Sequence, residues 1–208
     1  MNSTTENPPA PAARRTQAER SETMRARLAA AAYETVADGG LKALRLRNVA
    51  NAAGVSQGAL LHHFPDKNAV ILAAIEQALQ LARDDSLAFL DMPPEGPEGT
   101  LRAMLEEFRG FFFSDRFWVA MGIALEAARD ETLNPSVRER VARLRKPIYA
   151  AWEDRLIANG WSQRDAARIV RSGTSMISGA AVRRVWAQSD ELSIEMEEEW
   201  IADRLARR

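Results

Sequence analysis

The stretch Leu46–Phe64, LRNVANAAGVSQGALLHHF, predicts two short helices joined by a tight turn. In its first half, apolar residues recur at the spacing of one buried helical face: Leu46, Val49, Ala50 and Ala53. Gly54 can end a helix in the left-handed conformation without steric strain. Ser56 can then accept a hydrogen bond from the first free amides of a second helix. This is the sequence form of a helix-turn-helix, whose second helix enters the major groove of DNA.

The second helix, Ser56–His63, has an inward and an outward face. Its periodicity turns Ala59, Leu60 and His63 toward a core. The outward side begins with Gln57, whose amide suits bidentate contact with adenine, and Gly58 allows close approach of the backbone. Guanidinium groups near the first helix can bind phosphate or base edges. The predicted DNA-binding residues are Arg45, Arg47, Ser56, Gln57, Gly58, Leu61, His62 and Lys67.

Composition favours an all-α protein that can bury a sizeable core. The chain has 208 residues, 46% of them hydrophobic, and shows no alternating strand-like run. Its net charge is −1, but the charge is unevenly distributed. Residues 1–70 hold nine Lys/Arg and six Asp/Glu, whereas the remainder carries an excess of four acidic groups. A basic N-terminal part and an acidic remainder suit a protein that contacts DNA over a limited surface, although ordinary surface helices can produce the same asymmetry.

Several classes of function have no support in the residues. The chain has no cysteine, which excludes disulfides and thiolate chemistry. Its two histidines, His62 and His63, are adjacent, so on a helix they point about 100° apart and do not suggest a metal site. The longest strongly apolar run, Phe117–Leu125, is too short to span a membrane. The N-terminus has no apolar signal segment, so we expect a cytoplasmic protein without cofactor, metal or membrane partner.

The chain divides into three predicted parts. Residues 1–13 are polar and proline-rich and predict a disordered tail, with Arg14 and Arg15 following it. Residues 14–66 form the helix-turn-helix domain, and residues 67–208 form a larger helical bundle. Met92–Gly99 is rich in proline and glycine and predicts a loop. The expected helices outside the motif are Glu19–Asp38, Asp66 to about Leu90, Thr100–Phe113, Asp115–Asp130, Pro135–Asn159, Gln163–Ala187 and a last one to about Ala206.

The motif resembles that of TetR-type bacterial transcriptional regulators. The residues that match are Leu46, Arg47, Val49, Ala50, Ala53, Gly54, Val55, Ser56, Gly58, Leu60, His63, Phe64 and Lys67. The resemblance covers about Glu19–Leu81 directly, and the rest of the chain matches only in length and helical content. It implies about nine helices, a homodimer on a palindromic double-stranded DNA operator, and repression that a small molecule relieves.

Two residues depart from the pattern of that family. Members commonly carry a tyrosine at the position of Leu61, where it touches a phosphate. Leucine cannot donate a hydrogen bond, but it can contact a thymine methyl group or a backbone sugar. Members also often begin the first motif helix with Ser or Thr, where this chain has Leu44 and Arg45. Arg45 could then supply a phosphate contact in place of the missing cap.

Aromatic residues are concentrated in the second half of the chain and allow two readings. They can be the ordinary core of a bundle, in which the Phe117–Leu125 helix lies deepest because it is apolar all round. They can also form the wall of a pocket for an apolar or aromatic effector. The predicted ligand-binding residues are Phe108, Phe112, Trp118, Met121, Tyr149, Trp152 and Met176.

The last two helices predict a four-helix dimer interface. Small residues on Gln163–Ala187 allow a second helix to approach closely, although packing within one chain is the alternative. The predicted interface residues are Gly173, Ile177, Ala180, Met196 and Trp200. The favoured function is a homodimeric repressor released by its effector. An activator, or a regulator without a ligand, is the alternative. An all-α enzyme using Glu106, Glu107, Asp115 and Glu126 finds least support, because none of these carboxylates has a nucleophile, a paired base or a metal ligand at a telling spacing.

Overall fold

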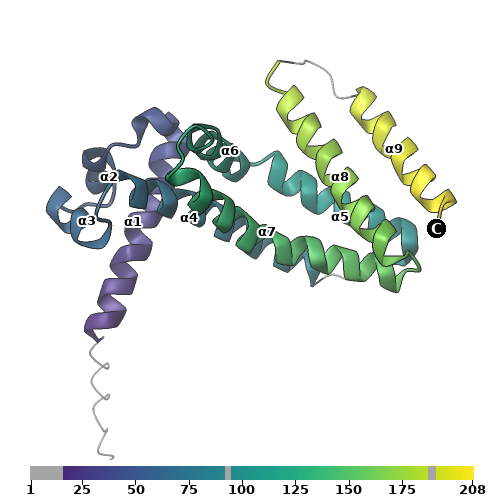
Figure 1. Ribbon diagram of the computed structural model, residues 1–208, viewed down its shortest axis with the longest axis horizontal. Coiled ribbons are helices and arrows are strands. Elements are labelled where there is room, and N and C mark those ends of the chain that lie inside the picture. The colour runs from purple at the N-terminus through teal and green to yellow at the C-terminus, as the bar shows by residue number, and fades with distance from the viewer. Residues whose placement is uncertain (1–15, 92–94, 187–190) are drawn as a thin grey trace, which may run out of the picture.

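The computed structural model describes residues 16–91, 95–186 and 191–208, and within these ranges the chain forms nine α-helices and no strand (Figure 1). The predicted all-α class is confirmed. The predicted disordered tail, with Arg14 and Arg15, lies outside the described residues, as do residues 92–94 of the loop predicted at Met92–Gly99. The end of that loop is wrong, because residues 96–99 form the first turn of a helix, Gly96–Phe112.

The N-terminal module consists of α1 (Gln17–Gly39), the short 3₁₀ turn η1 (Leu41–Ala43), α2 (Leu46–Ala52) and α3 (Gln57–His63). Leu28, Val49 and Leu60 are fully buried and hold the helices together. Local signals determine the helix ends. Gly54 has φ +63°, as the turn requires, and the Ser56 hydroxyl accepts a hydrogen bond from the Ala59 amide at 3.2 Å. The predicted helix-turn-helix is therefore present.

Helix α4 (Lys67–Leu90) connects this module to the rest of the molecule (Figure 1). The Asp66 carboxylate caps it by accepting a hydrogen bond from the Ala69 amide at 2.7 Å. Helix α4 packs against α1 and also against α6 and α7. Its predicted apolar stripe is buried: Ile71, Ala74, Ile75, Ala78, Leu79 and Ala82. A movement of α4 would therefore change the packing of both the helix-turn-helix module and the helical bundle.

The larger part of the molecule is a helical bundle. Its helices are α5 (Gly96–Phe112), α6 (Asp115–Ala127), α7 (Leu133–Ala158), α8 (Gln163–Arg183) and α9 (Glu191–Ala206). Helix α5 packs against α8 and α9, while α7 packs against α4 and α8. Helices α8 and α9 lie next to each other at the end of the molecule away from the helix-turn-helix (Figure 1). Among the described helices, none is both long and apolar enough to cross a membrane.

Three expectations about these helices are corrected by the structure. Helix α7 begins at Leu133, ahead of the expected start at Pro135, because the Asp130 carboxylate accepts hydrogen bonds from the Thr132 and Leu133 amides. Helix α6 does not lie deepest, since Trp118 is 38% exposed and Leu125 is 64% exposed. Helix α8 ends at Arg183, four residues before the expected end.

Candidate functional site: a DNA-binding face and the interior of the bundle

The outward face of α3 is formed as the sequence predicts, with one correction. Gln57, Gly58 and His62 are exposed, and Leu61 is 38% exposed. Ala59, which was expected inside, is also exposed, and His63 is only half-buried. The helix has only seven residues, so a single large residue, Leu60, suffices to anchor it. Most of α3 is therefore available to a partner.

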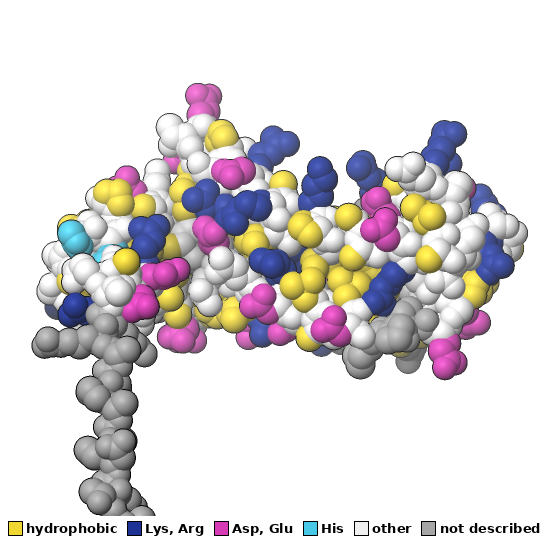
Figure 2. Space-filling view, turned by 90° about the horizontal axis from the view of Figure 1, so that it is seen from below, with side chains coloured by type: hydrophobic (Ala, Val, Ile, Leu, Met, Phe, Trp, Pro, Cys, Tyr) yellow, Lys and Arg dark blue, Asp and Glu magenta, His cyan; other side chains and the backbone are white. Residues whose placement is uncertain are grey.

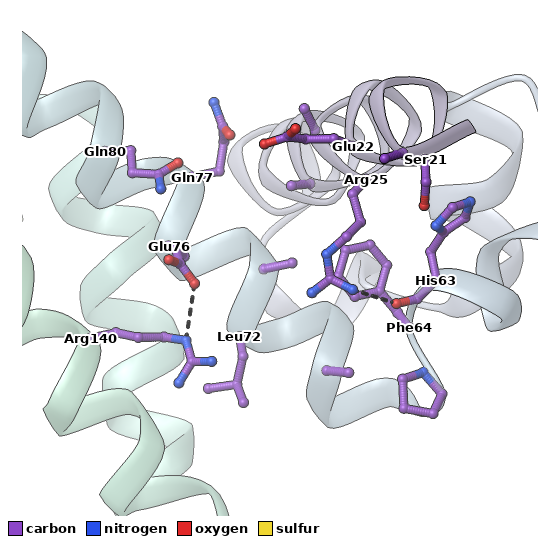
Figure 3. A pocket seen from close by; sticks show the side chains of 16 residues that line it. Ser21, Glu22, Arg25, His63, Phe64, Leu72, Glu76, Gln77, Gln80 and Arg140 are labelled. Carbon is purple, nitrogen blue, oxygen red and sulfur yellow. Dashed lines mark hydrogen bonds and ion pairs between the residues drawn. The ribbon is translucent and has the colours of Figure 1, made fainter. Parts of the chain in front are cut away.

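Arg25 of α1 holds the C-terminal end of α3 (Figure 3). Its guanidinium donates a hydrogen bond to the His63 carbonyl at 2.8 Å and lies 4.7 Å from the centroid of the Phe64 ring. A cation at the C-terminal end of a helix also complements the helix dipole. These groups line one end of an open groove of about 690 Å³ between α1 and α4. Arg25 thus fixes the orientation of α3 relative to α1, a role that no pattern in the sequence predicted.

The cations around α3 are exposed and unpaired. Arg45, Arg47 and Lys67 make no ion pair within the described part of the chain. In the bundle, several arginines pair with carboxylates, whereas others on its surface, such as Arg129, Arg138 and Arg164, are unpaired among the described residues, like those around α3. Figure 2 shows acidic and basic side chains interspersed over one face of the molecule, with the histidines of α3 at its left end. The unpaired charges around α3 are free to bind phosphate.

Replacing Arg25 and Arg47 separately should distinguish a positioning residue from a phosphate contact. We expect Arg25→Ala to lower DNA affinity about tenfold, because a charged hydrogen bond that orients α3 is lost. The slope of log affinity against log salt should stay unchanged. Arg47→Ala should make that slope shallower by about one per protomer, because a phosphate contact releases counterions. Fluorescence anisotropy over a salt series measures both. An equally shallow slope for Arg25→Ala would mean that Arg25 itself contacts DNA.

The predicted ligand-binding residues do not surround one cavity. Phe108 and Trp152 are fully buried, and the Phe108 ring lies 5.9 Å from that of Tyr149. Phe112 and Trp118 belong to a separate aromatic stack around Phe117, with ring centroids 5.0 and 5.2 Å from that residue. The remaining two, Met121 and Met176, line a groove beside α8 and α9. The aromatic concentration is mostly a packed core, which is the plainer of the two readings.

A buried polar network lies beside this core, and sequence reasoning did not find it. Glu107 of α5, which is 5% exposed, accepts hydrogen bonds from the Ser86 hydroxyl of α4 and from the Trp152 indole N–H of α7, the latter at 3.1 Å. The Arg145 guanidinium of α7 lies 3.4 Å from the same carboxylate and 3.2 Å from the Ser86 oxygen. One face of the guanidinium stacks on the Phe111 ring at 4.3 Å. The network therefore links helices α4, α5 and α7 around one buried charge pair.

A cavity of about 150 Å³ opens next to this network, between α4, α5 and α6. Ser86 and Glu107 lie at its polar side, and Phe89 and Phe111 contribute aromatic walls. Arg116 of α6 is paired with Asp85 of α4, and both line the cavity. At about 150 Å³ the cavity is smaller than most small-molecule sites, and five of its nine lining residues are polar or charged, so it has room only for a small ligand with polar groups.

The predicted dimer-interface residues differ in their exposure. Gly173 and Ile177 are buried, and a Cβ at Gly173 would lie 3.2 Å from the Leu105 and Met104 side chains of α5 and 3.5 Å from the Trp200 ring of α9 in the same chain. Their side chains are thus used within the protomer, and the intramolecular alternative describes them better. Ala180 is also nearly buried. Met196 is 51% exposed and, with Trp200, lines an open groove of about 830 Å³ between α8 and α9.

A charged clamp fixes α9 to α5 and predicts a pH dependence. Arg102 donates two hydrogen bonds of 2.7 Å to the Glu198 carboxylate, which lowers the pKa of Glu198. A lowered pKa in the folded state means that the stabilisation is complete above the ordinary pKa of about 4.3 and is lost as the pH falls through the lower folded value. We therefore expect Arg102→Ala to speed amide exchange in α9 at pH 7, and the difference between variant and parent to shrink as the pH falls below the ordinary pKa of Glu198. A difference that does not shrink at acid pH would assign the clamp to packing instead.

Comparison with known proteins agrees with this geometry. The family model for bacterial regulatory proteins of the tetR family matches residues 28–74, which include α2, α3 and the start of α4. The chain is 34% identical over 179 residues to the HTH-type transcriptional regulator CymR of Pseudomonas putida, covering 86% of this chain and 87% of that protein. It is 27% identical over 166 residues to the HTH-type transcriptional regulator BetI of Rhizobium meliloti (strain 1021), covering 79% of each. The multidrug binding protein EbrR, solved with proflavin, has the same fold, with a TM-score of 0.60 at 18% identity, over 85% of this chain and 99% of that one.

An exposed recognition helix, free cations around it and a helical bundle behind it define a DNA-binding transcriptional regulator of the helix-turn-helix class. The chain belongs to the TetR family. The predicted family and fold are confirmed, while the individual DNA, ligand and dimer contacts remain predictions.

Proposed function

We propose that this regulator is a homodimeric repressor that binds a palindromic operator in the cytoplasm and leaves it when a small molecule enters the bundle. The observation that carries the DNA-binding part is the outward face of α3, which is exposed and flanked by the unpaired Arg45, Arg47 and Lys67. Two such faces in a dimer would enter successive major grooves about 34 Å apart. Bound over a promoter, the dimer would block transcription.

The groove between α8 and α9 supports the dimer. Its walls combine small residues with large apolar ones, and a Cβ added at Gly179 would have nothing within 4 Å. At its rim Trp186 is 70% exposed. Apolar surface of this kind marks an interaction site, and a helix of a second copy fits an elongated groove lined by small residues. The proposed interface therefore keeps Met196 and Trp200 and replaces the buried Gly173 and Ile177 with the exposed face of α8.

The cavity beside Glu107 supports a small effector with an apolar or aromatic body and polar groups. Ser86 and Phe89, both on α4, line it, and α4 follows α3 after only three residues. An effector that binds better when α4 is displaced would shift the population away from the DNA-binding conformation. The fold relative EbrR is a multidrug binding protein that binds proflavin, which agrees with a ligand in the bundle.

Transcription in vitro tests the proposal. A duplex that the protein selects from a random-sequence pool is placed over a promoter, and a compound panel is then added. We expect the protein to lower transcript yield and one class of compound to restore it. Gly110→Leu is the matched variant, because Gly110 lines the cavity and has open space for a side chain. It should bind DNA normally but no longer respond. Raised transcript yield would instead support an activator, and unchanged repression across the panel would support a regulator without a ligand.

A further inference from the structure

Nothing within the chain explains why residue 58 is a glycine. It lies inside the helix α3, and it is not among the described glycines with positive φ, which are Gly40, Gly54, Gly96 and Gly160. A Cβ at Gly58 would meet only the Ser56 oxygen, at an ordinary 3.9 Å. Glycine is a poor helix former, so alanine would suit this position better if folding alone decided. The missing side chain is therefore of use only to a partner outside the chain.

Leu61 lies one turn further along the same face. It is three residues after Gly58 and four after Gln57, and side chains at these spacings are neighbours on a helix. It is 38% exposed, and it is the only large hydrophobic residue that is exposed in the N-terminal module over residues 16–66. The two positions thus lie side by side on the exposed face of α3: Gly58 leaves the backbone bare, Leu61 presents an apolar side chain, and Gln57 lies next to both.

We propose that Gly58 and Leu61 together recognise the 5-methyl group of a thymine in the operator. The inference rests on the proposed function, in which α3 enters the major groove. Thymine is the only unmodified DNA base that presents a methyl group there, and apolar side chains are its natural partners. The bare backbone at Gly58 lets α3 approach the base pair, and Leu61 then covers the methyl group. Specificity for thymine then comes from Leu61, whose side chain has no hydrogen-bond donor.

Uracil substitution tests this directly, because deoxyuridine pairs like thymidine but lacks the methyl group. Each thymidine of a duplex selected by the protein is replaced in turn, in both half-sites symmetrically, and the affinity is measured. At one position per half-site we expect about a fourfold loss for each methyl group removed, hence about fifteenfold for the symmetric pair. Leu61→Ala should bind the unmodified duplex more weakly and should no longer distinguish thymidine from deoxyuridine at that position.

Other outcomes overturn the proposal in recognisable ways. If no position is sensitive to deoxyuridine, or if Leu61→Ala keeps the same sensitivity, Leu61 contacts the sugar–phosphate backbone and does not read thymine. If the protein selects no duplex at all, the proposed function itself fails, and the two failures are therefore distinct.

Gly58→Ala provides an independent test. Because the site has room and alanine favours a helix, we expect the melting temperature to rise by about 2–4 °C. Affinity for the selected duplex should nevertheless fall about tenfold or more, since the Cβ occupies the space of the methyl group. Gly122→Ala is the matched control, an open helical glycine on α6, and should leave DNA affinity unchanged. If Gly58→Ala binds the duplex as tightly as the parent, the bare backbone at Gly58 has no part in recognising the methyl group.

Discussion

Replacing Arg145 with alanine is expected to lower the free energy of unfolding by about 3–5 kcal/mol. Glu107 would keep only the Ser86 hydroxyl and the Trp152 indole N–H as partners, at a position that is only 5% exposed. A buried charge that loses its counterion is among the most destabilising changes a protein can suffer. This loss is a large fraction of the 5–15 kcal/mol that typically holds a domain folded.

A double replacement separates the charge from the packing. Arg145→Met with Glu107→Leu removes both charges and retains most of the side-chain volume, so most of the lost stability should return. Urea unfolding followed by circular dichroism gives the midpoint and slope for all three proteins. If the double variant is as unstable as Arg145→Ala, the loss comes from the shape of the core. If Arg145→Ala is as stable as the parent, the pair does not join α5 and α7 in solution.

Glutamate at Gly179 is expected to separate the protomers and to lower operator affinity by at least about two orders of magnitude. The position is open within one chain, so the protomer should fold normally. In the proposed dimer, however, a partner helix approaches this face, and the carboxylate would crowd that helix and lose its hydration, with only Arg183 one turn away to offset the cost. A monomer holds only one half-site, so the gain of about 10²–10⁴ from two linked contacts is lost.

The control for this variant is Gly122→Glu, which also places a carboxylate at an open helical glycine, but on α6 outside the groove. Sedimentation velocity reports the mass of each protein, and gel shift reports its affinity. The control and the parent should both sediment as dimers. A dimeric Gly179→Glu protein with full DNA affinity would place the interface elsewhere on the molecule.

The parts that the sequence predicted well depend on local chemistry. Ser56 and Asp66 cap the helices that follow them, and Gly54 adopts the left-handed conformation that the turn needs, because each depends only on neighbours in the chain. The motif's buried and exposed sides follow from helical spacing, except at Ala59, where a short helix needs only one anchor.

The parts that it missed depend on distant residues. Ser86, Glu107 and Arg145 are separated by 21 and 38 positions, and none of the three has a telling neighbour in sequence. Helical periodicity shows that one face of a helix is buried, but it does not show which other helix packs against that face. The small residues of α8 pointed to a close helix contact, and Gly173 makes one, but with α5 of its own chain. Likewise Trp118 and Leu125 are partly exposed on a helix whose apolar pattern predicted full burial.

The number of protein chains bound to one DNA duplex tests whether this regulator acts as a homodimer on a palindromic operator. Native mass spectrometry or sedimentation would be run with a duplex selected by the protein, and with the same duplex after one half-site is scrambled. A homodimer should place two chains on the intact duplex and should bind the scrambled duplex at least about a hundredfold more weakly. A single chain per duplex that binds both DNAs equally well would contradict the homodimer proposal.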